Sequence, residues 1–284
     1  MKKFLFRLSV FCILTFAAQY ITYFAIKKAL DKKSQFRLTR YFRAPKHKYF
    51  VIGNSRGLNS INEKYANETL KIDLINLSVN GEPYKNALNI LDDINERNKN
   101  SVIFLEITCL NKNYFDHSYS YYISDSKILR KAYAGKTYNW LHLLRLNNEL
   151  FLRNIYYLKK SDNDGINKNT ITKNMIDHIK IDSSFRINDN EGIYLNRLTT
   201  LQKICDDHGN KLIFFLTPFY PEYLSKITDY NSTIQFMNVN KTKFNFVNLN
   251  NIKLPDYMFA DRIHTNYKGS VPLTRALIDS SKYY

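Results

Sequence analysis

A serine, an aspartate and a histidine in two separate stretches of this chain could together do nucleophilic chemistry. Ser55 lies in VIGNSRGLNSI (51–61), where an apolar run stops at a glycine and the chain turns sharply. Asp261 and His264 lie three residues apart in MFADRIHTNYKGS (258–270). A serine hydroxyl is a weak nucleophile until a base takes its proton, and an imidazole oriented by a carboxylate can be that base. The spacing therefore predicts Ser55 as nucleophile, His264 as base and Asp261 as the group that fixes and stabilises the imidazole.

Three further residues could stabilise the oxyanion that such a reaction forms. Gly81 has no side chain, so its backbone N–H could approach a ligand closely, and Asn80 or Asn111 could add an amide donor. Asn80 and Asn111 also fit ordinary turn or loop positions, so either could serve. Arg56 has two open interpretations, an ion pair with a neighbouring acid or a contact with an anionic substrate.

Short apolar runs alternate with helix-like segments along most of the chain. Such runs suit strands buried on both faces, and their alternation with helices favours a parallel, doubly wound sheet. The sequence therefore predicts an α/β fold, a three-layer sandwich around a mostly parallel sheet. The expected strands are KYFVIG (48–53), KIDLINLS (71–78), SVIFLEIT (101–108), KLIFFLT (211–217) and FNFVNLN (244–250), with helices near 84–98, near 194–208 and after Gly269.

The candidate residues follow the first strands of this expected sheet. Ser55 follows the first strand, Asn80 and Gly81 follow the second, and Asn111 follows the third. Ligands of open α/β sheets bind beyond the carboxyl ends of the strands, so these residues are expected at one edge.

Residues 110–193 interrupt the alternation and are rich in Tyr and Asn. We interpret them as an insertion over one edge of the sheet, with one helix near 138–160 and a polar loop at 159–169. The expected domain of 48–284 thus contains an insertion at about 110–193.

Residues 8–26 contain no charge and are just long enough to cross a hydrocarbon core as a helix. Lysine and arginine flank the run on both sides, and a good signal-peptide cleavage site is missing. We expect a transmembrane anchor over 1–30 and a basic juxtamembrane linker over 31–47. The large domain is expected outside the cytoplasm, although the more basic C-terminal flank taken alone would favour the opposite orientation.

The net charge of +17 does not indicate nucleic-acid binding, because the excess is concentrated near the N-terminus. Residues 1–50 hold twelve Lys or Arg and one acid, which leaves the rest of the chain only mildly basic. No RNA-binding or zinc-finger pattern appears in the remainder. We therefore expect no nucleic-acid partner.

The motifs resemble those of the SGNH/GDSL hydrolase superfamily. GNSRGLNSI (53–61) resembles its serine block, NLSVNG (76–81) its glycine block, and DRIH (261–264) its Asp-x-x-His block. The blocks span nearly all of the chain beyond the apolar segment. The GNSR form and the N-terminal anchor look like those of membrane-anchored cell-envelope members, which include teichoic acid D-alanylation proteins and polysaccharide O-acetyltransferases.

The resemblance implies the same roles for Ser55, His264 and Asp261, and it implies Gly81 as an oxyanion donor. The chain departs from the family in the third block, where LEITCLN (105–111) replaces the usual Gly-x-Asn-Asp. This departure puts the asparagine donor in doubt.

These observations predict a membrane-anchored serine acyltransferase or esterase acting on acyl groups, most simply acetyl, of an envelope polysaccharide. It would need no metal or organic cofactor, and a membrane protein that delivers the acyl donor is an expected partner. Two alternatives are a plain carboxylesterase and a non-catalytic scaffold that binds polysaccharide or a partner membrane protein.

Overall fold

The structure is a computed structural model that describes residues 1–160, 165–179 and 191–284. Four residues of the polar loop predicted at 159–169 lie outside these ranges. The chain divides into two compact units. Unit 1 comprises Met1–Ala44 and His117–Asn163, and unit 2 comprises Pro45–Asp116 and Asp164–Tyr284.

Unit 2 is built on a five-stranded sheet in the order β2-β1-β3-β4-β5, with every neighbouring pair parallel. All five predicted strands are confirmed, each one to five residues shorter than the apolar run that indicated it. In this flavodoxin-like order, β2 is added on one side of β1 and all later strands on the other side. Sheets of this kind bind ligands at the switch point between β1 and β3. The strands are β1 (Tyr49–Ile52), β2 (Leu74–Asn76), β3 (Val102–Glu106), β4 (Lys211–Leu216) and β5 (Phe246–Asn248).

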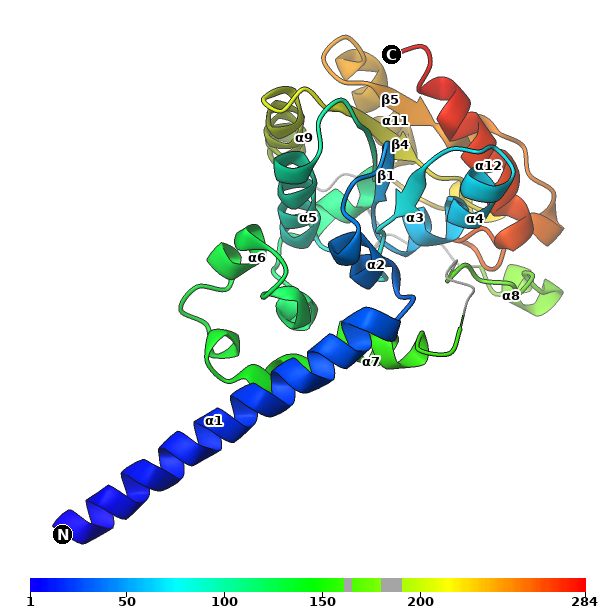
Figure 1. The fold of residues 1–284 in the computed structure, drawn as a ribbon. Helices are drawn as coiled ribbons and strands as arrows, with labels where there is room; N and C mark the ends of the chain where they lie inside the picture. Colours follow the sequence, from blue (N-terminus) through cyan, green and yellow to red (C-terminus); the bar gives the residue numbers. More distant parts are fainter. Residues whose placement is uncertain (161–164, 180–190) are drawn as a thin grey trace. The chain divides into compact units, whose positions relative to one another are not determined.

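Helices cover both faces of this sheet, so the predicted three-layer α/β architecture is confirmed (Figure 1). One face carries α5 (Tyr84–Arg97) and α9 (Glu191–Asp206), which contact each other and the sheet. The other carries α3 (Ser55–Ser60), α4 (Glu63–Glu68) and α12 (Tyr267–Ser280). Successive strand residues point to opposite faces, so Val51 and Phe104 pack with Leu273 and Leu277 of α12 in one buried cluster.

Shorter helices complete unit 2 and were not predicted individually. Part of the predicted insertion, including α8, belongs to this unit. The remaining elements are η1 (Ile107–Asn111), α8 (Lys173–Asp177), α10 (Pro221–Leu224), α11 (Tyr230–Asn240), η5 (Leu249–Asn251) and η6 (Asp256–Met258).

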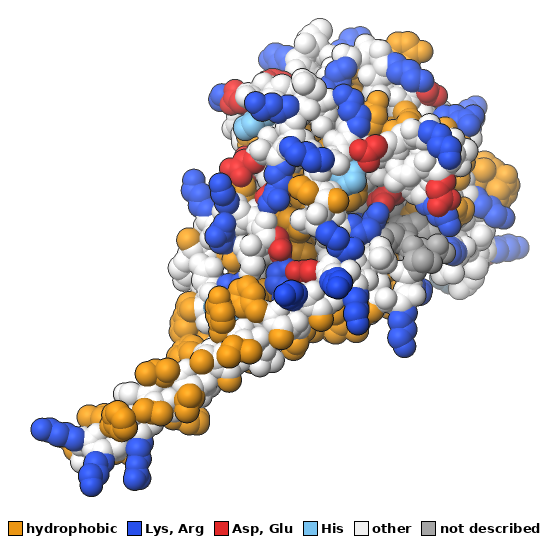
Figure 2. All heavy atoms as spheres, in the orientation of Figure 1, with side chains coloured by type: hydrophobic (Ala, Val, Ile, Leu, Met, Phe, Trp, Pro, Cys, Tyr) orange, Lys and Arg blue, Asp and Glu red, His pale blue; other side chains and the backbone are white. Residues whose placement is uncertain are grey.

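Unit 1 joins the N-terminal helix to the larger part of the predicted insertion. Helix α1 is long and apolar enough to cross a membrane, a test that a signal sequence also passes. Figure 2 shows apolar side chains along this helix and Lys and Arg side chains at its N-terminal tip. The elements are α1 (Lys2–Lys33), α2 (Arg37–Arg43), η2 (His117–Tyr122), α6 (Lys127–Ala132), η3 (Thr137–Asn139), η4 (His142–Leu146) and α7 (Glu149–Tyr156).

Polar contacts to the C-terminal part of α1 hold unit 1 together. The Lys27 ammonium contacts Asp31 and lies 2.7 Å from a carboxylate oxygen of Asp125. The Tyr23 hydroxyl donates to the Tyr121 carbonyl at 3.1 Å, and the Tyr121 hydroxyl donates to Asp31 at 3.0 Å. These pairings explain why residues of the insertion fold with α1.

The stretch 31–47, which the sequence predicted as a linker, contains ordered structure. Helix α1 continues to Lys33, and α2 follows with buried Leu38 and Tyr41. The predicted linker is therefore partly a packed helix, which carries several of the basic side chains of this stretch.

Candidate active site

The turn after β1 presents Ser55 as the first residue of α3. Asn54 caps this helix, because its side-chain oxygen accepts the Arg56 backbone N–H at 2.8 Å. The Asn54 side-chain amide also donates to the Thr108 hydroxyl at 2.8 Å. The cap is thereby fastened to the segment that follows β3, which fixes the position of Ser55.

Two glycines let this turn pack closely between its neighbours. A Cβ atom on Gly53 would lie 2.7 Å from the Glu106 Cβ atom, and one on Gly57 would lie 2.8 Å from the Ser78 hydroxyl oxygen. The Gly-x-Ser-x-Gly-like pattern thus meets a steric demand, since larger residues would push Ser55 away from the ends of β2 and β3.

The loop before α12 holds Asp261 and His264 in a compact turn. One Asp261 carboxylate oxygen accepts the backbone N–H groups of Ile263 and His264 at 2.8 and 2.9 Å. The Ala260 N–H donates to the His264 carbonyl at 2.9 Å, which closes the turn. The three-residue spacing lets one carboxylate brace both the loop and the ring.

The structure brings the three predicted side chains into one hydrogen-bonded row. The second Asp261 oxygen lies 2.8 Å from His264 Nδ1, and His264 Nε2 lies 2.8 Å from Ser55 Oγ. With Asp261 ionised, Nδ1 carries the ring proton and Nε2 can accept the Ser55 hydroxyl proton. The His264 side chain is 18% exposed, so the row opens to solvent at the surface of unit 2.

The surroundings of Asp261 keep its carboxyl ionised. Burial alone would raise its pKa, but the hydrogen bond and charge interaction with His264 and the two backbone N–H donors lower it overall. An ionised Asp261 is the form that stabilises a protonated imidazole.

Arg56 lies beside the nucleophile and is almost completely buried. Its guanidinium donates to the Ile263 carbonyl at 2.9 Å, contacts the Thr217 carbonyl, and lies 3.5 Å from the centre of the Phe219 ring. Its Nε lies 3.4 Å from a Glu106 carboxylate oxygen. Of its two open interpretations, the structure supports the ion pair with a neighbouring acid.

Glu106 closes a ring of contacts beneath the Ser55 turn. Its other carboxylate oxygen accepts from the Thr108 backbone N–H at 3.0 Å and from the Thr108 hydroxyl, which in turn accepts from Asn54. Burial raises the pKa of Glu106 and lowers that of Arg56, and the attraction between the two opposes both shifts. Arginine nevertheless stays protonated in proteins, so the guanidinium keeps its charge.

The predicted oxyanion residues follow β2 and β3 at the same edge of the sheet as Ser55. The Val79 N–H donates to the Gly53 carbonyl at 3.0 Å, so the chain reaches Asn80 and Gly81 directly beside the Ser55 turn. Gly81 has a φ of 71°, in the left-handed region, and both it and Asn80 are exposed. Asn111 ends η1 and is partly buried. All three remain candidate donors by position.

Asn54, Glu106 and Thr108 complete the site and were not singled out from the sequence. Glu106 carried a signal, since a lone acid at the end of a buried strand needs a partner. Asn54 and Thr108 carried none, because short polar residues after strands are common in turns.

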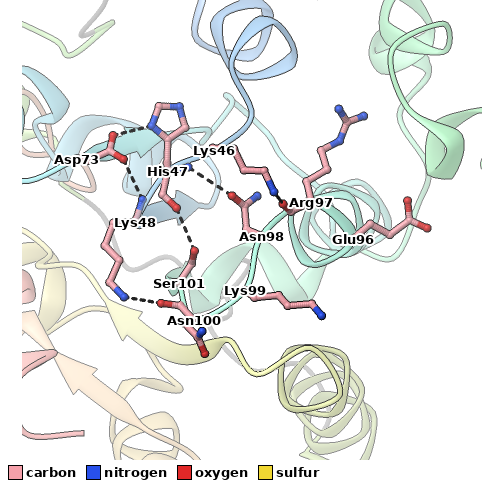
Figure 3. A pocket seen from close by; sticks show the side chains of 10 residues that line it. All are labelled: Lys46, His47, Lys48, Asp73, Glu96, Arg97, Asn98, Lys99, Asn100 and Ser101. Carbon is pink, nitrogen blue, oxygen red and sulfur yellow. Dashed lines mark hydrogen bonds and ion pairs between the residues drawn. The ribbon is translucent and has the colours of Figure 1, made fainter.

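A separate hollow of about 620 Å³ lies at the amino ends of β1 and β3 (Figure 3). His47 Nδ1 lies 2.7 Å from Asp73 there, and the Ser101 hydroxyl donates to the His47 carbonyl at 3.0 Å. Because His47 precedes β1 and Ser55 follows it, the hollow is at the opposite end of the strands from the Ser55 row.

Within the described ranges, no three His, Cys, Asp or Glu side chains are arranged to hold a metal ion. Proton transfer from a serine hydroxyl to an imidazole requires only those two side chains and a group that orients the ring. The row of Ser55, His264 and Asp261 contains all the groups that this proton transfer needs.

Comparison with known proteins found structural likenesses at low sequence identity, including those to two crystal structures. No family model matches the chain, and no curated protein matches it. A crystal structure described as a "putative acylhydrolase" from Bacteroides fragilis is 10% identical, covers 87% of this chain and 96% of its own, and has a TM-score of 0.42. The YXIM protein of Bacillus subtilis is 11% identical over 84% of this chain and 56% of its own, with a TM-score of 0.40. The Ser55 row, rather than these two likenesses, indicates the chemistry of the site.

Proposed function

We propose that Ser55, His264 and Asp261 form the catalytic triad of an acyl hydrolase or acyltransferase that works through an acyl-enzyme. The observation that carries this proposal is the unbroken row in which both His264 ring nitrogens lie 2.8 Å from their partners. These are the distances at which a base can take the proton of a nucleophile.

In the first half of the reaction, His264 Nε2 takes the hydroxyl proton as Ser55 Oγ attacks the carbonyl carbon of an ester. Asp261 stabilises the imidazolium that forms. When the tetrahedral intermediate collapses, the ester C–O bond breaks and His264 gives its proton to the leaving oxygen. The acyl group is now bonded to Ser55.

In the second half, water or a sugar hydroxyl attacks the acyl-enzyme and gives its proton to His264. Collapse releases an acid or a new ester and restores the Ser55 hydroxyl. Hydrolysis and transfer therefore differ only in the attacking oxygen, and exclusion of water decides between them.

The oxyanion would be held by backbone N–H groups at the start of α3 and at Gly81, with Asn80 or Asn111 as a side-chain donor. Donors aimed at developing charge are worth about 2.7–4 kcal/mol each in comparable sites.

The proposed substrate is an acyl ester, most simply acetyl, on a cell-envelope polysaccharide. The resemblance of the serine, glycine and Asp-x-x-His blocks to membrane-anchored SGNH/GDSL members supports this choice, as does the membrane-length helix α1. We propose that α1 anchors the protein, with unit 2 outside the cytoplasm, and that a membrane protein supplies the acyl donor to a transferase. A reporter fused after Tyr284 should be located outside the cytoplasm and show its activity there. Reporter activity in the cytoplasm would contradict this topology.

A fluorophosphonate probe separates catalysis from a scaffold role. The wild-type protein should be labelled on the peptide containing Ser55, Ser55→Ala should not be labelled, and Ser225→Ala, an exposed serine elsewhere in unit 2, should be labelled normally. A folded wild-type protein that takes no label, with unimpaired biological function in Ser55→Ala, would favour a scaffold that binds polysaccharide or a partner protein.

The rate on p-nitrophenyl acetate distinguishes a transferase from a plain carboxylesterase. A transferase should hydrolyse it slowly and turn over faster when an acceptor glycan is added. Fast hydrolysis with no effect of glycan would favour the plain esterase.

A further inference from the structure

Helix α1 packs against the rest of unit 1 along one face of its C-terminal part, where Tyr23, Lys27 and Leu30 are buried. Tyr23 is fully buried and Lys27 is 4% exposed, whereas the N-terminal part of the helix exposes apolar side chains. Because Lys27 and its acidic partners are already within the folded unit, lipid contact begins on the N-terminal side of Lys27, and Phe24 and Ile26, each 36% exposed, can still face lipid. The exposed apolar residues of this part are Phe4, Leu5, Phe6, Leu8, Val10, Phe11, Ile13, Leu14, Phe16, Tyr20 and Ile21.

A segment of the insertion, residues 137–146, runs along α1 into this exposed part. The His142 ring lies 5.5 Å from the Tyr23 ring between centres, and the Leu143 N–H donates to the Gln19 side chain at 3.2 Å. Trp140 reaches farther, with its ring centre 6.5 Å from that of Phe16. The segment thus accompanies the helix at least as far as Phe16.

The length of α1 fixes what surrounds this segment if the helix crosses a bilayer. A hydrocarbon core about 30 Å thick requires about 20 helical residues at about 1.5 Å each. Residues 1–16 supply only about 24 Å, so the core must extend past Phe16, to about residue 20 even when it starts at Met1. Phe16 then lies at least about 6 Å inside the hydrocarbon boundary, and a core that starts at Leu8, where the uncharged run begins, or any tilt places it deeper.

The side chains of the segment suit that depth. Trp140 is 56% exposed, and Leu143 and Leu144 are 40% and 44% exposed. Indole rings and leucines of this kind are what interfacial segments bury about 5–10 Å into a bilayer.

The part of the insertion that belongs to unit 1 has a charge complementary to an anionic membrane surface. Residues 117–160 contain eight Lys or Arg and only two acids. Six of these cations are exposed, and basic residues near a membrane are attracted to anionic headgroups. The exposed cations are Lys127, Arg130, Lys131, Lys136, Lys159 and Lys160.

We propose that the 137–146 segment inserts part of the way into the bilayer beside α1. It would form a second membrane contact without crossing the bilayer. The inference rests on the proposed role of α1 as a membrane anchor, and it commits to lipid as what covers Trp140, Leu143 and Leu144. The anchor then holds unit 1 against the membrane through two elements.

The chain supplies its own probes for a test. Trp140 is its single tryptophan. Cys12 is its single exposed cysteine, since Cys109 and Cys205 are buried. Tryptophan fluorescence therefore reports on the segment, and thiol labelling independently reports on the span.

The full-length protein would be reconstituted into vesicles of phosphatidylcholine and phosphatidylglycerol. Quenching of Trp140 by lipids brominated near the top of the acyl chain would be compared with quenching by aqueous iodide. A membrane-impermeant maleimide would probe Cys12 in the same vesicles. The matched control is Trp140→Phe combined with Tyr257→Trp, which moves the fluorophore to an exposed position in unit 2.

We expect Trp140 to be quenched by brominated lipid and protected from iodide, the Tyr257→Trp control to show the reverse, and Cys12 to be unreactive. Unreactive Cys12 with Trp140 quenched only by iodide would overturn the insertion but leave the anchor intact. Protection of Trp140 from both quenchers would mean that a protein surface covers it, which also overturns the proposal. Reactive Cys12 would refute the anchor itself, while the acyl chemistry stays open to its own fluorophosphonate test.

Discussion

The guanidinium of Arg56 donates to the carbonyl oxygen of Ile263 at 2.9 Å, so the residue after the proposed nucleophile holds the residue before the proposed base. The stretches that contain Ser55 and His264 are separated by about 200 residues of sequence, and this hydrogen bond links them. Because the Glu106 carboxylate lies against the same guanidinium, one buried ion pair positions both sides of the Ser55–His264 contact.

Arg56→Met is therefore expected to impair both folding stability and turnover. It leaves the buried Glu106 carboxylate without its charge partner, which typically costs about 3–5 kcal/mol. Displacement of the His264 loop by about 1 Å would lower kcat about 100-fold. Urea unfolding and esterase assays would measure the two effects, and Arg275→Met on the exposed face of α12 should change neither. Full activity in a folded Arg56→Met protein would show that Arg56 does not position the site.

Asp261→Asn should leave a folded protein with very low activity. An amide in place of the carboxylate favours the wrong imidazole tautomer and cannot stabilise the imidazolium, an effect of about 10⁴ in kcat in a comparable triad. Steady-state kinetics together with circular dichroism would check both halves of this prediction. Near-normal turnover would remove Asp261 from the mechanism.

Acid should abolish the stabilising contribution of Asp261. The folded-state pKa of this carboxyl lies below its ordinary value of 3.8, so its contribution is complete above pH 3.8 and is lost as pH falls through the folded value. The difference in unfolding free energy between wild type and Asp261→Asn should hence shrink as the pH falls below 3.8. A difference that grows on acidification would mean that the folded pKa is raised instead.

The sequence was informative wherever a pattern is local. Strands buried on both faces appear as continuous apolar runs, so all five could be predicted, and in a parallel sheet their ends meet at one edge. The close approach of Ser55 to the Asp-x-x-His stretch followed from those strand ends.

Pairings between distant residues could not be predicted in the same way. The Arg56–Glu106 pair and the contact between Lys27 and Asp125 join residues with no periodic relation, so the sequence did not indicate which acid each cation would contact. For the same reason, nothing local in 117–160 indicated that it would pack with α1.

Gly53→Ala tests the steric demand at the nucleophile turn. The added methyl would lie 2.7 Å from the Glu106 Cβ atom, and such overpacking typically costs about 1–3 kcal/mol. Because the strain falls beside Ser55, kcat should drop as well. The control is Gly135→Ala, whose added methyl meets open space in unit 1 and should lower stability by about 1–2 kcal/mol through its φ of 74° without affecting kcat. Equal kinetics in the two variants would contradict the close-packing argument.

Asn80 is expected to be the side-chain oxyanion donor rather than Asn111. Asn80 is exposed directly beside the Ser55 turn, whereas Asn111 is partly buried at the end of η1. Asn80→Ala should lower kcat by about 10²–10³ with little change in stability, and Asn111→Ala should not. The opposite ranking in steady-state kinetics would assign the role to Asn111.

The central claim is that Ser55 becomes acylated with His264 as its base, and rapid acid quenching during turnover of p-nitrophenyl acetate tests it most directly. Mass analysis of the digested protein should find an acetyl group on the peptide that contains Ser55 in the wild type. That group should be absent in Ser55→Ala and form far more slowly in His264→Ala. Release of p-nitrophenol at the wild-type rate by Ser55→Ala, or an acetyl group on any other residue as the reacting species, would contradict the account.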